Sequence, residues 1–307
     1  MSTKHQIRIG SKEVTVTNPD KIFYPSTSFN KGAMIDYYQQ IAPVLQPHLK
    51  GRAITLKRYP DGVAGNFFYE KQCPSHAPSW LKTTPVEKAD GTMIQYCMIH
   101  DLPSLVWAAN IANLEFHPFL HRATSPSKPT SLVFDLDPGP PADVLNCCQV
   151  ALRIHDLFHS LGLEIFIKTS GSKGLQLMVP LNGGAAYGQT KSFAHSVAEA
   201  LAFKFPKEVT ADMKKSLRTG KVLIDWSQND AKKTTVSAYS LRAMDEPLVS
   251  TPLTWLEVES ALHQKSLSRL RFAARDVIKR VAKTGDLFEE TLKLKQNLPK
   301  VEFRGAD

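Results

Sequence analysis

Three acidic residues lie in or beside apolar stretches, where a carboxylate is unexpected unless it serves a site. Asp135 and Asp137 are two residues apart at the end of an apolar run, so a strand there would direct both carboxylates to one face. Asp225 closes a second apolar run, 222–224. Neighbouring carboxylates repel unless they share a proton or bind a cation, and their hard oxygen atoms suit Mg²⁺ or Mn²⁺.

The chemistry that these three carboxylates predict is phosphoryl or nucleotidyl transfer. Acids on two strands can hold two divalent cations about 4 Å apart, one activating a hydroxyl group and one steadying the leaving phosphate. Two structural alternatives stay open. Asp137, Pro138 and Gly139 can form a turn, and Asp225 can begin the polar loop 227–230.

A polar loop lies between the two acidic segments. Residues 168–174 read Lys-Thr-Ser-Gly-Ser-Lys-Gly, and such a loop can turn backbone N–H groups toward a phosphate while Lys173 supplies positive charge. The spacing is not that of a Walker loop, and an ordinary hairpin is the alternative.

Cations and aromatic residues also lie close together earlier in the chain. Lys57 and Arg58 follow an apolar run, and Phe67 and Phe68 come soon after. An aromatic ring can stack on a base while a cation binds phosphate, although core aromatics are the alternative. Strand alternation predicts that only one of the two phenylalanines faces a site and that the other lies in the core.

The expected elements form an α+β protein. Before a proline-bearing connector at 122–130, we expect helices at 31–45 and 102–113 and short strands at 53–56 and 66–69. After it, we expect strands at 131–136, 163–168, 175–179 and 221–226 and helices at 142–161 and 190–203. The predicted division of this single catalytic unit, 1–307, is an N-terminal lobe at 1–125, a catalytic core at 126–262 and a basic helical segment at 263–307.

The composition is that of a packed globular protein with an anionic partner. The 307 residues carry a formal net charge of +9, which favours nucleic acid. No apolar run approaches the ~18 residues of a membrane span and the N-terminus lacks a signal-peptide core, so we expect a cytoplasmic protein with no membrane association. The four cysteines indicate reduced thiols, and the C-x-x-H pairs that begin at Cys73 and Cys97 are interpreted as buried cysteines near surface histidines rather than as a zinc site.

Six ordered motifs resemble the polymerase domain of bacterial ligase D, of the archaeo-eukaryotic primase superfamily. The resemblance runs from about residue 16 to residue 258, and its motifs lie at 17–25, 114–118, 135–138, 170–175, 222–225 and 236–242. It implies a two-lobed primase-polymerase fold, in which a central mixed sheet with packed helices carries the catalytic carboxylates beside a smaller mixed N-terminal lobe. It also implies a polymerase that fills and extends broken DNA ends in non-homologous end joining.

The resemblance implies a role for each matching residue. Asp135, Asp137 and Asp225 would bind two Mn²⁺ or Mg²⁺ ions and act in catalysis. Lys21 and Lys31 would recognise a 5′-phosphate of the DNA. Phe67 would stack on the incoming base, and His117 would lie beside the sugar and phosphates of the NTP or dNTP. The full set implied for nucleotide binding is Lys57, Arg58, Phe67, His117, Ser170, Gly171, Ser172, Lys173, Gly174, Gln176, Gln228 and Arg242.

This sequence departs from the family's motif at Gln176, where the usual residue after Gly-Leu is histidine. Glutamine can donate a hydrogen bond but cannot carry a positive charge, so triphosphate binding is expected to be weaker. Restoring a histidine would then tighten nucleotide binding when the imidazole is protonated. Gln228 stands where some members carry arginine.

We therefore predict a template-guided polymerase that adds ribonucleotides or deoxyribonucleotides to 3′ DNA ends. Its expected partners are DNA ends, nucleoside triphosphates, Ku and a DNA ligase acting in trans. Two rival functions stay open, a primase that starts chains de novo and a catalytically weak DNA-end-binding protein. Primer extension with labelled nucleotides separates all three.

Overall fold

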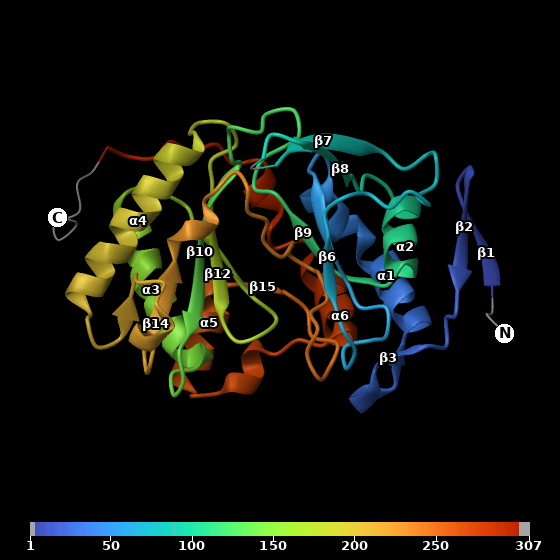
Figure 1. Ribbon diagram of the computed structural model, residues 1–307. Coiled ribbons are helices and arrows are strands. Elements are labelled where there is room, and N and C mark those ends of the chain that lie inside the picture. The colour runs from blue at the N-terminus through green and yellow to red at the C-terminus, as the bar shows by residue number, and fades with distance from the viewer. Residues whose placement is uncertain (1–3, 89, 301–307) are drawn as a thin grey trace. The chain divides into compact units, whose positions relative to one another are not determined.

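The computed structural model describes residues 4–88 and 90–300, and the chain divides into two compact units (Figure 1). The first unit comprises residues 1–119, 234–250 and 273–286, and the second comprises residues 120–233, 251–272 and 287–307. Both units are discontinuous in sequence, whereas the predicted segments 1–125, 126–262 and 263–307 were contiguous. The ends of those segments, 1–3 and 301–307, lie outside the described residues.

The return of the chain to the first unit has a physical cause. Thr234 forms an isolated bridge with Phe119, and the Ser237 backbone N–H donates to the carbonyl oxygen of Phe116 at 2.9 Å. Residues 234–250 therefore satisfy backbone groups at the edge of a first-unit strand. Pairing between segments so far apart in the sequence leaves no local pattern from which it could be predicted.

A five-stranded sheet forms the centre of the first unit. Its strands have the order β6-β5-β8-β7, and β9 pairs along β5. The bounds are β5 Ile54–Arg58, β6 Phe68–Glu70, β7 Thr83–Glu87, β8 Met93–Cys97 and β9 Asn113–Pro118. Two small hairpins are made by β1 Lys4–Ile9 with β2 Lys12–Thr17, and by β3 Ile22–Tyr24 with β4 Phe29–Asn30. The helices are α1 Lys31–Leu49, α2 Leu102–Asn110 and α6 Ala274–Thr284.

The helix α1 begins at a side-chain cap. Asn30 accepts a hydrogen bond from the backbone N–H of Ala33 at 2.8 Å, which satisfies one donor of the first turn. Met34, Ile41 and Leu45 are fully buried at helical spacing. The helix continues four residues beyond the predicted end at residue 45, because this buried face outweighs the hydrogen bonds that its internal prolines remove.

A six-stranded sheet forms the centre of the second unit, in the order β13-β14-β10-β12-β11-β15. The bounds are β10 Ser131–Pro138, β11 Phe166–Thr169, β12 Leu175–Pro180, β13 Val209–Thr210, β14 Val222–Asp225 and β15 Pro252–Leu253. All neighbours are antiparallel except β13 and β14, so the sheet is mixed, as predicted. The helices are α3 Val144–Ser160, α4 Tyr187–Lys204 and α5 Trp255–His263.

The two faces of this sheet differ in chemistry. Alternate residues of β10, β12 and β14, among them Leu136, Leu177 and Ile224, join one core cluster with buried residues of α3 and α4. Phe158 of α3 and Phe193 of α4 have ring centroids 6.0 Å apart, so these helices lie side by side on that face (Figure 1). The intervening strand residues, which include the predicted catalytic acids, lie on the opposite face.

The C-terminal segment differs from the helical segment that was predicted. Within its described part, 263–300, the regular α-helix beyond α5 is α6, and the remainder consists of short turns and extended chain. Five short 3₁₀ helices complete the described chain: Pro25–Thr27, Lys215–Leu217, Trp226–Gln228, Leu267–Leu270 and Glu289–Leu292. Within the described residues, no helix has the length and apolar composition needed to cross a bilayer.

Candidate active site

Asp135 and Asp225 lie opposite each other on neighbouring strands of the second unit. The antiparallel strands β10 and β14 pair with the Cα atoms of these two residues in register. Asp137 follows two residues later on β10 and shares the face of Asp135, since Leu136 between them points into the helix-side core. The structure therefore brings the three predicted carboxylates together on one sheet face.

Asp225 and Asp137 already have partners within the protein. Asp225 Oδ1 accepts hydrogen bonds from the N–H of Ser227 at 2.8 Å and from its hydroxyl at 2.6 Å. Asp225 Oδ2 accepts one from Gln228 Nε2 at 2.9 Å. Asp137 Oδ2 lies 3.4 Å from Arg218 Nη1. The predicted nucleotide-binding residue Gln228 therefore contacts Asp225, one of the predicted catalytic acids.

The charged form of Asp135 is disfavoured by its surroundings. Burial and the facing charge of Asp225 raise the pKa of Asp135 to about 6, against the opposing effects of Gln176 and Lys168. A bound cation would relieve this repulsion, and the donor set consists of hard carboxylate oxygen atoms. Among the described residues, no three acidic, histidine or cysteine side chains are grouped as ligands around a metal position.

The Ser-Gly loop of the second unit is folded tightly on itself. The hydroxyl of Ser170 accepts from the N–H groups of Ser172 at 3.2 Å and Gly174 at 3.1 Å. Gly171 has a φ of +69°, which favours glycine. Gly174 lies against β10, where a Cβ atom would overlap the carbonyl oxygen of Leu136. The loop is therefore packed against the strand between the two β10 acids, and Lys173 is exposed beside it.

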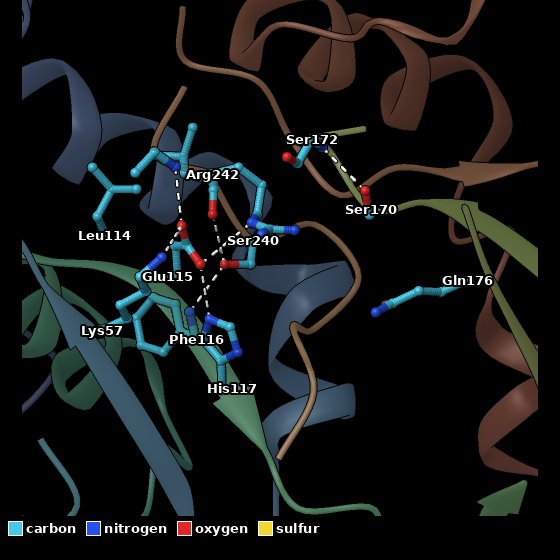
Figure 2. A network of polar contacts seen from close by, with 12 residues as sticks. Lys57, Leu114, Glu115, Phe116, His117, Ser170, Ser172, Gln176, Ser240 and Arg242 are labelled. Atoms are coloured by element: carbon cyan, nitrogen blue, oxygen red, sulfur yellow. Dashed lines mark hydrogen bonds and ion pairs between the residues drawn. The ribbon is translucent and has the colours of Figure 1, made fainter. Parts of the chain in front are cut away.

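In the first unit, two cations and one imidazole surround one buried acid. Glu115, which is 1% exposed, lies on β9. Its carboxylate oxygens lie 3.2 Å from Lys57 Nζ, 2.9 Å from His117 Nε2 and 3.3 Å from Arg242 Nε. The backbone N–H of Ala243 donates to it at 3.0 Å. Figure 2 shows the three side chains converging on this carboxylate, so three predicted nucleotide-binding residues share one anchor.

The charges of this cluster are strongly coupled. Burial alone would raise the pKa of Glu115, but the hydrogen bond from His117 and the charges of Arg242 and Lys57 hold it well below its usual range. Burial lowers the pKa of His117, and Arg242 and Lys57 lower it further, against the raising effect of Glu115. Two permanent cations thus face one anion, which leaves net positive charge for an anionic ligand.

The aromatic residues near this cluster are exposed. Phe67 is 51% exposed, stacks on Tyr59 at a centroid distance of 5.3 Å and has Lys57 Nζ 4.6 Å from its ring centre. The prediction that one of Phe67 and Phe68 lies in the core is wrong, because Phe68 is 42% exposed. Phe68 begins the edge strand β6 and covers the guanidinium of Arg58, whose charge is paired with Glu70 at 2.7 Å.

The two lysines predicted to bind a 5′-phosphate have different surroundings. Lys21 is exposed and pairs with Asp61 at 2.7 Å. Lys31 is buried, and its ammonium donates to the carbonyl oxygen of Thr17 at 2.6 Å. Burial and the nearby charges of Lys21 and Arg58 lower the pKa of Lys31 to about 8. Lys21 can exchange Asp61 for another anion, whereas the buried Lys31 would have to give up its hydrogen bond to Thr17 to reach a phosphate.

Comparison with known proteins identifies the family of the chain. Residues 30–288 match the LigD primase-polymerase domain. The chain belongs to this family. It is 44% identical over 278 residues to the multifunctional non-homologous end joining protein LigD of Mycolicibacterium smegmatis, covering 90% of this chain and 36% of that protein. It is 33% identical to the bifunctional LigD of Bacillus subtilis, covering 92% and 45%.

A solved structure of a ligase D polymerase domain has the same fold as this LigD-family chain. The polymerase domain of Mycobacterium tuberculosis ligase D, solved in complex with DNA, matches with a TM-score of 0.85 and 38% identity. The match covers 92% of this chain and 99% of that domain, which confirms the predicted α+β primase-polymerase fold. The chain spans less than half the length of these two LigD relatives.

Two buried polar residues near the predicted site residues, one in each unit, were missed in the sequence. Glu115 carried a signal, since an acid between Leu114 and Phe116 in an apolar strand is as unexpected as Asp135. Asn229 carried none. Its fully buried amide accepts from the N–H of Val133 at 2.9 Å and donates to the Val133 carbonyl at 2.7 Å, which ties the loop after Asp225 to β10.

Proposed function

We propose that this chain is a template-guided nucleotidyltransferase that extends 3′ DNA ends in non-homologous end joining. The single observation that carries the proposal is the in-register pair of Asp135 and Asp225, with Asp137 on the same face. Two carboxylates that destabilise each other's charged form are both stabilised as anions by a bound cation. Membership of the LigD primase-polymerase family supports this interpretation.

Asp135, Asp137 and Asp225 would hold two divalent cations, Mn²⁺ or Mg²⁺. Bound there, such cations activate a primer hydroxyl and neutralise charge on the leaving phosphates. The chain's own contribution is to position the oxygen atoms. Ser227 and Gln228 fix the carboxylate of Asp225, and Arg218 restrains that of Asp137.

The residues around Glu115 would bind the nucleoside triphosphate. Lys57 and Arg242 carry fixed positive charge, and Glu115 restrains their side chains so that little conformational entropy is lost on binding. His117 would lie beside the sugar and phosphates. Phe67, half exposed and braced by Tyr59, would stack on the base without reading its identity.

The Ser-Gly loop of the second unit would contribute further phosphate contacts. Ser170 and the exposed Lys173 are the proposed donors, and Gly171, Ser172 and Gly174 shape the loop. Arg58 is committed to Glu70 and to the carbonyl oxygen of Ile111, so its proposed contribution is to the shape of β5 and β6.

DNA ends with a 5′-phosphate are the proposed polymeric substrate, with Lys21 and Lys31 as the phosphate-binding residues. The net charge of +9 supports an anionic partner. Ku and a DNA ligase acting in trans are the proposed protein partners, and the non-homologous end joining names of the LigD relatives support this role.

Extension of a labelled primer across a gapped duplex tests the proposal. The parent chain should add nucleotides with Mn²⁺ or Mg²⁺ and lose activity with a chelator, and Asp135→Asn should be inactive. Products made without a primer would favour a primase. Tight DNA binding with no extension under any metal would overturn the polymerase and leave an end-binding protein.

A further inference from the structure

A row of polar side chains crosses four strands of the second unit's sheet. Lys168 on β11 lies opposite Gln176 on β12. Gln176 in turn lies opposite Asp135 on β10, which lies opposite Asp225 on β14. The neighbours of these residues along each strand point into the helix-side core, so the row shares the opposite face. One cation, one amide and two carboxylates are therefore aligned.

Lys168 is an unusual member of this row because it is 1% exposed. Lysine is almost never fully buried unless its charge is compensated, and an apolar residue of similar size would avoid the desolvation cost. Its ammonium donates to Gln176 Oε1 at 2.6 Å. The burial of a charge next to a catalytic strand indicates a functional rather than a stabilising role.

The chemistry of the two neighbours dictates the orientation of the Gln176 amide. An ammonium group can only donate, so the amide oxygen must face Lys168. An ionised carboxylate can only accept, so the amide nitrogen faces Asp135, to which Gln176 donates a hydrogen bond. A flipped amide would set donor against donor and acceptor against acceptor. Lys168 therefore selects one of two nearly isosteric orientations.

We propose that Lys168 is a positioning residue that acts through Gln176 to orient the Asp135 carboxylate for cation binding. This inference rests on the proposed function, because it gives a role to a residue behind the catalytic acids. A fixed amide restrains rotation of the carboxylate, and the buried ammonium offsets part of the negative charge of the row. Loss of such outer partners typically costs about 10- to 100-fold in metal affinity or activity.

The test measures Mn²⁺ binding to the nucleotide-free chain, by the paramagnetic resonance signal of free Mn²⁺, together with primer extension. Lys168→Met preserves side-chain length and removes the donor and charge, and we expect Mn²⁺ affinity to fall roughly tenfold. Lys191→Met is the matched control, since Lys191 pairs with Asp230 in the same unit and should leave Mn²⁺ affinity unchanged. Lys168→Arg retains a charged donor and should remain close to the parent.

A double-mutant cycle separates positioning from other roles. In a Gln176→Leu background there is no amide to orient, so Lys168→Met should change Mn²⁺ affinity by less than about twofold. An equal loss in both backgrounds would overturn the inference, because Lys168 would then act without Gln176. A merely structural lysine would lower the melting temperature and leave Mn²⁺ affinity unchanged, which also overturns it.

Folding of each variant is checked by circular dichroism. If Lys168→Met does not fold, Lys168→Arg and the double variant, which replaces the pair by apolar side chains, carry the test. The two proposals fail separately. A parent chain that neither binds Mn²⁺ nor extends primers refutes the proposed function, whereas an active parent with an unaffected Lys168→Met refutes only the positioning role.

Discussion

The two units organise charge in opposite ways. In the first unit, the cations Lys57 and Arg242 and the imidazole of His117 gather around one buried acid, Glu115. In the second, Asp135 and Asp225 face each other in a row that ends at one buried cation, Lys168. Each set that would meet a ligand is thus anchored by a single residue of the opposite charge.

The buried acids of the two units, Glu115 and Asp135, differ in how well their charged forms are stabilised. Glu115 is surrounded by donors, so its charged form is strongly favoured and its pKa is lowered. Asp135 faces another acid, so its charged form is disfavoured and its pKa is raised. In the first unit the neighbouring charges therefore stabilise one another. In the second unit the two carboxylates repel each other, and a bound cation would relieve that repulsion. Removing one acid from each unit should have opposite consequences.

The largest expected effect is on catalysis by the second unit. Asp135→Asn removes one proposed cation ligand and keeps the shape of the side chain. Primer extension should fall by more than the roughly 100-fold that loss of an outer-shell partner costs, while DNA binding persists. Gel-based extension and binding assays on the same preparation check both outcomes. Near-parental extension would show that the carboxylate pair has no role in metal binding.

The next effect is on stability, where replacing each of the two acids should change the free energy of unfolding in opposite directions. Glu115→Gln leaves two partly buried cations without their buried counter-charge and should lower the free energy of unfolding by about 3 kcal/mol. Asp135→Asn relieves repulsion in the metal-free protein and should raise it, on the order of 1 kcal/mol at neutral pH. Urea denaturation in the presence of a chelator measures both. A loss of stability in both variants would contradict the opposite charge balance of the two units.

The pH dependence of these stability differences sharpens the same comparison. The pKa of Glu115 is lowered by folding, so its contribution is present above its ordinary value of 4.5 and declines in acid. The deficit of Glu115→Gln should therefore shrink below pH 4.5. The pKa of Asp135 is raised from 3.8 to about 6, so the advantage of Asp135→Asn should appear as pH rises through this window and vanish below it. If the stability differences of the two variants had the same dependence on pH, the pKa directions given for Glu115 and Asp135 would both be contradicted.

Much of the second unit could be predicted because its signals are local. Apolar runs and helix periodicity gave strands and helices close to those observed, and the i, i+2 spacing placed Asp135 and Asp137 on one face. The strand expected at 163–168 begins only at Phe166, since its first residues follow the turn after α3.

The parts that could not be predicted depend on contacts between distant segments. The partners of Glu115 come from residues 57, 117 and 242, and no local pattern indicates that they meet. The exposure of both Phe67 and Phe68 depends on β6 being a sheet edge, which follows from strand order. The row from Lys168 to Asp225 likewise depends on the register of four strands. Chemistry-bearing residue types were visible in the sequence, but the contacts between them and their anchors were not.

A smaller effect is expected at Lys21 in the first unit, which lies at the surface. Lys21→Ala should weaken binding to gapped DNA with a 5′-phosphate roughly five- to tenfold and have little effect on the same DNA without it. Asp61→Asn is the matched control, because it releases Lys21 from its exposed ion pair and should strengthen phosphate-dependent binding. Fluorescence anisotropy with the two DNAs measures this. An equal loss on both DNAs would reduce Lys21 to general backbone attraction.

The smallest effect is expected at Gln176, although the sequence alone predicts a gain from histidine. A protonated imidazole would set a second donor against the Lys168 ammonium, which lies 2.6 Å from the present amide oxygen. A neutral imidazole instead offers an acceptor to Lys168 and an N–H to Asp135, the same pattern as the amide. Gln176→His should therefore change nucleotide affinity by less than about threefold, equally at pH 6 and pH 8.

Nucleotide titrations of the parent, Gln176→His and Gln176→Ala at the two pH values decide between these accounts. Gln176→Ala removes both the acceptor and the donor, so it should bind nucleotide more weakly than either of the others. A charge-assisted contact is roughly twice as strong as a neutral one, so an active imidazolium would tighten binding at pH 6 by about 1 kcal/mol. That gain at low pH would mean that Lys168 does not control position 176, because a buried ammonium in contact with the ring opposes its protonation.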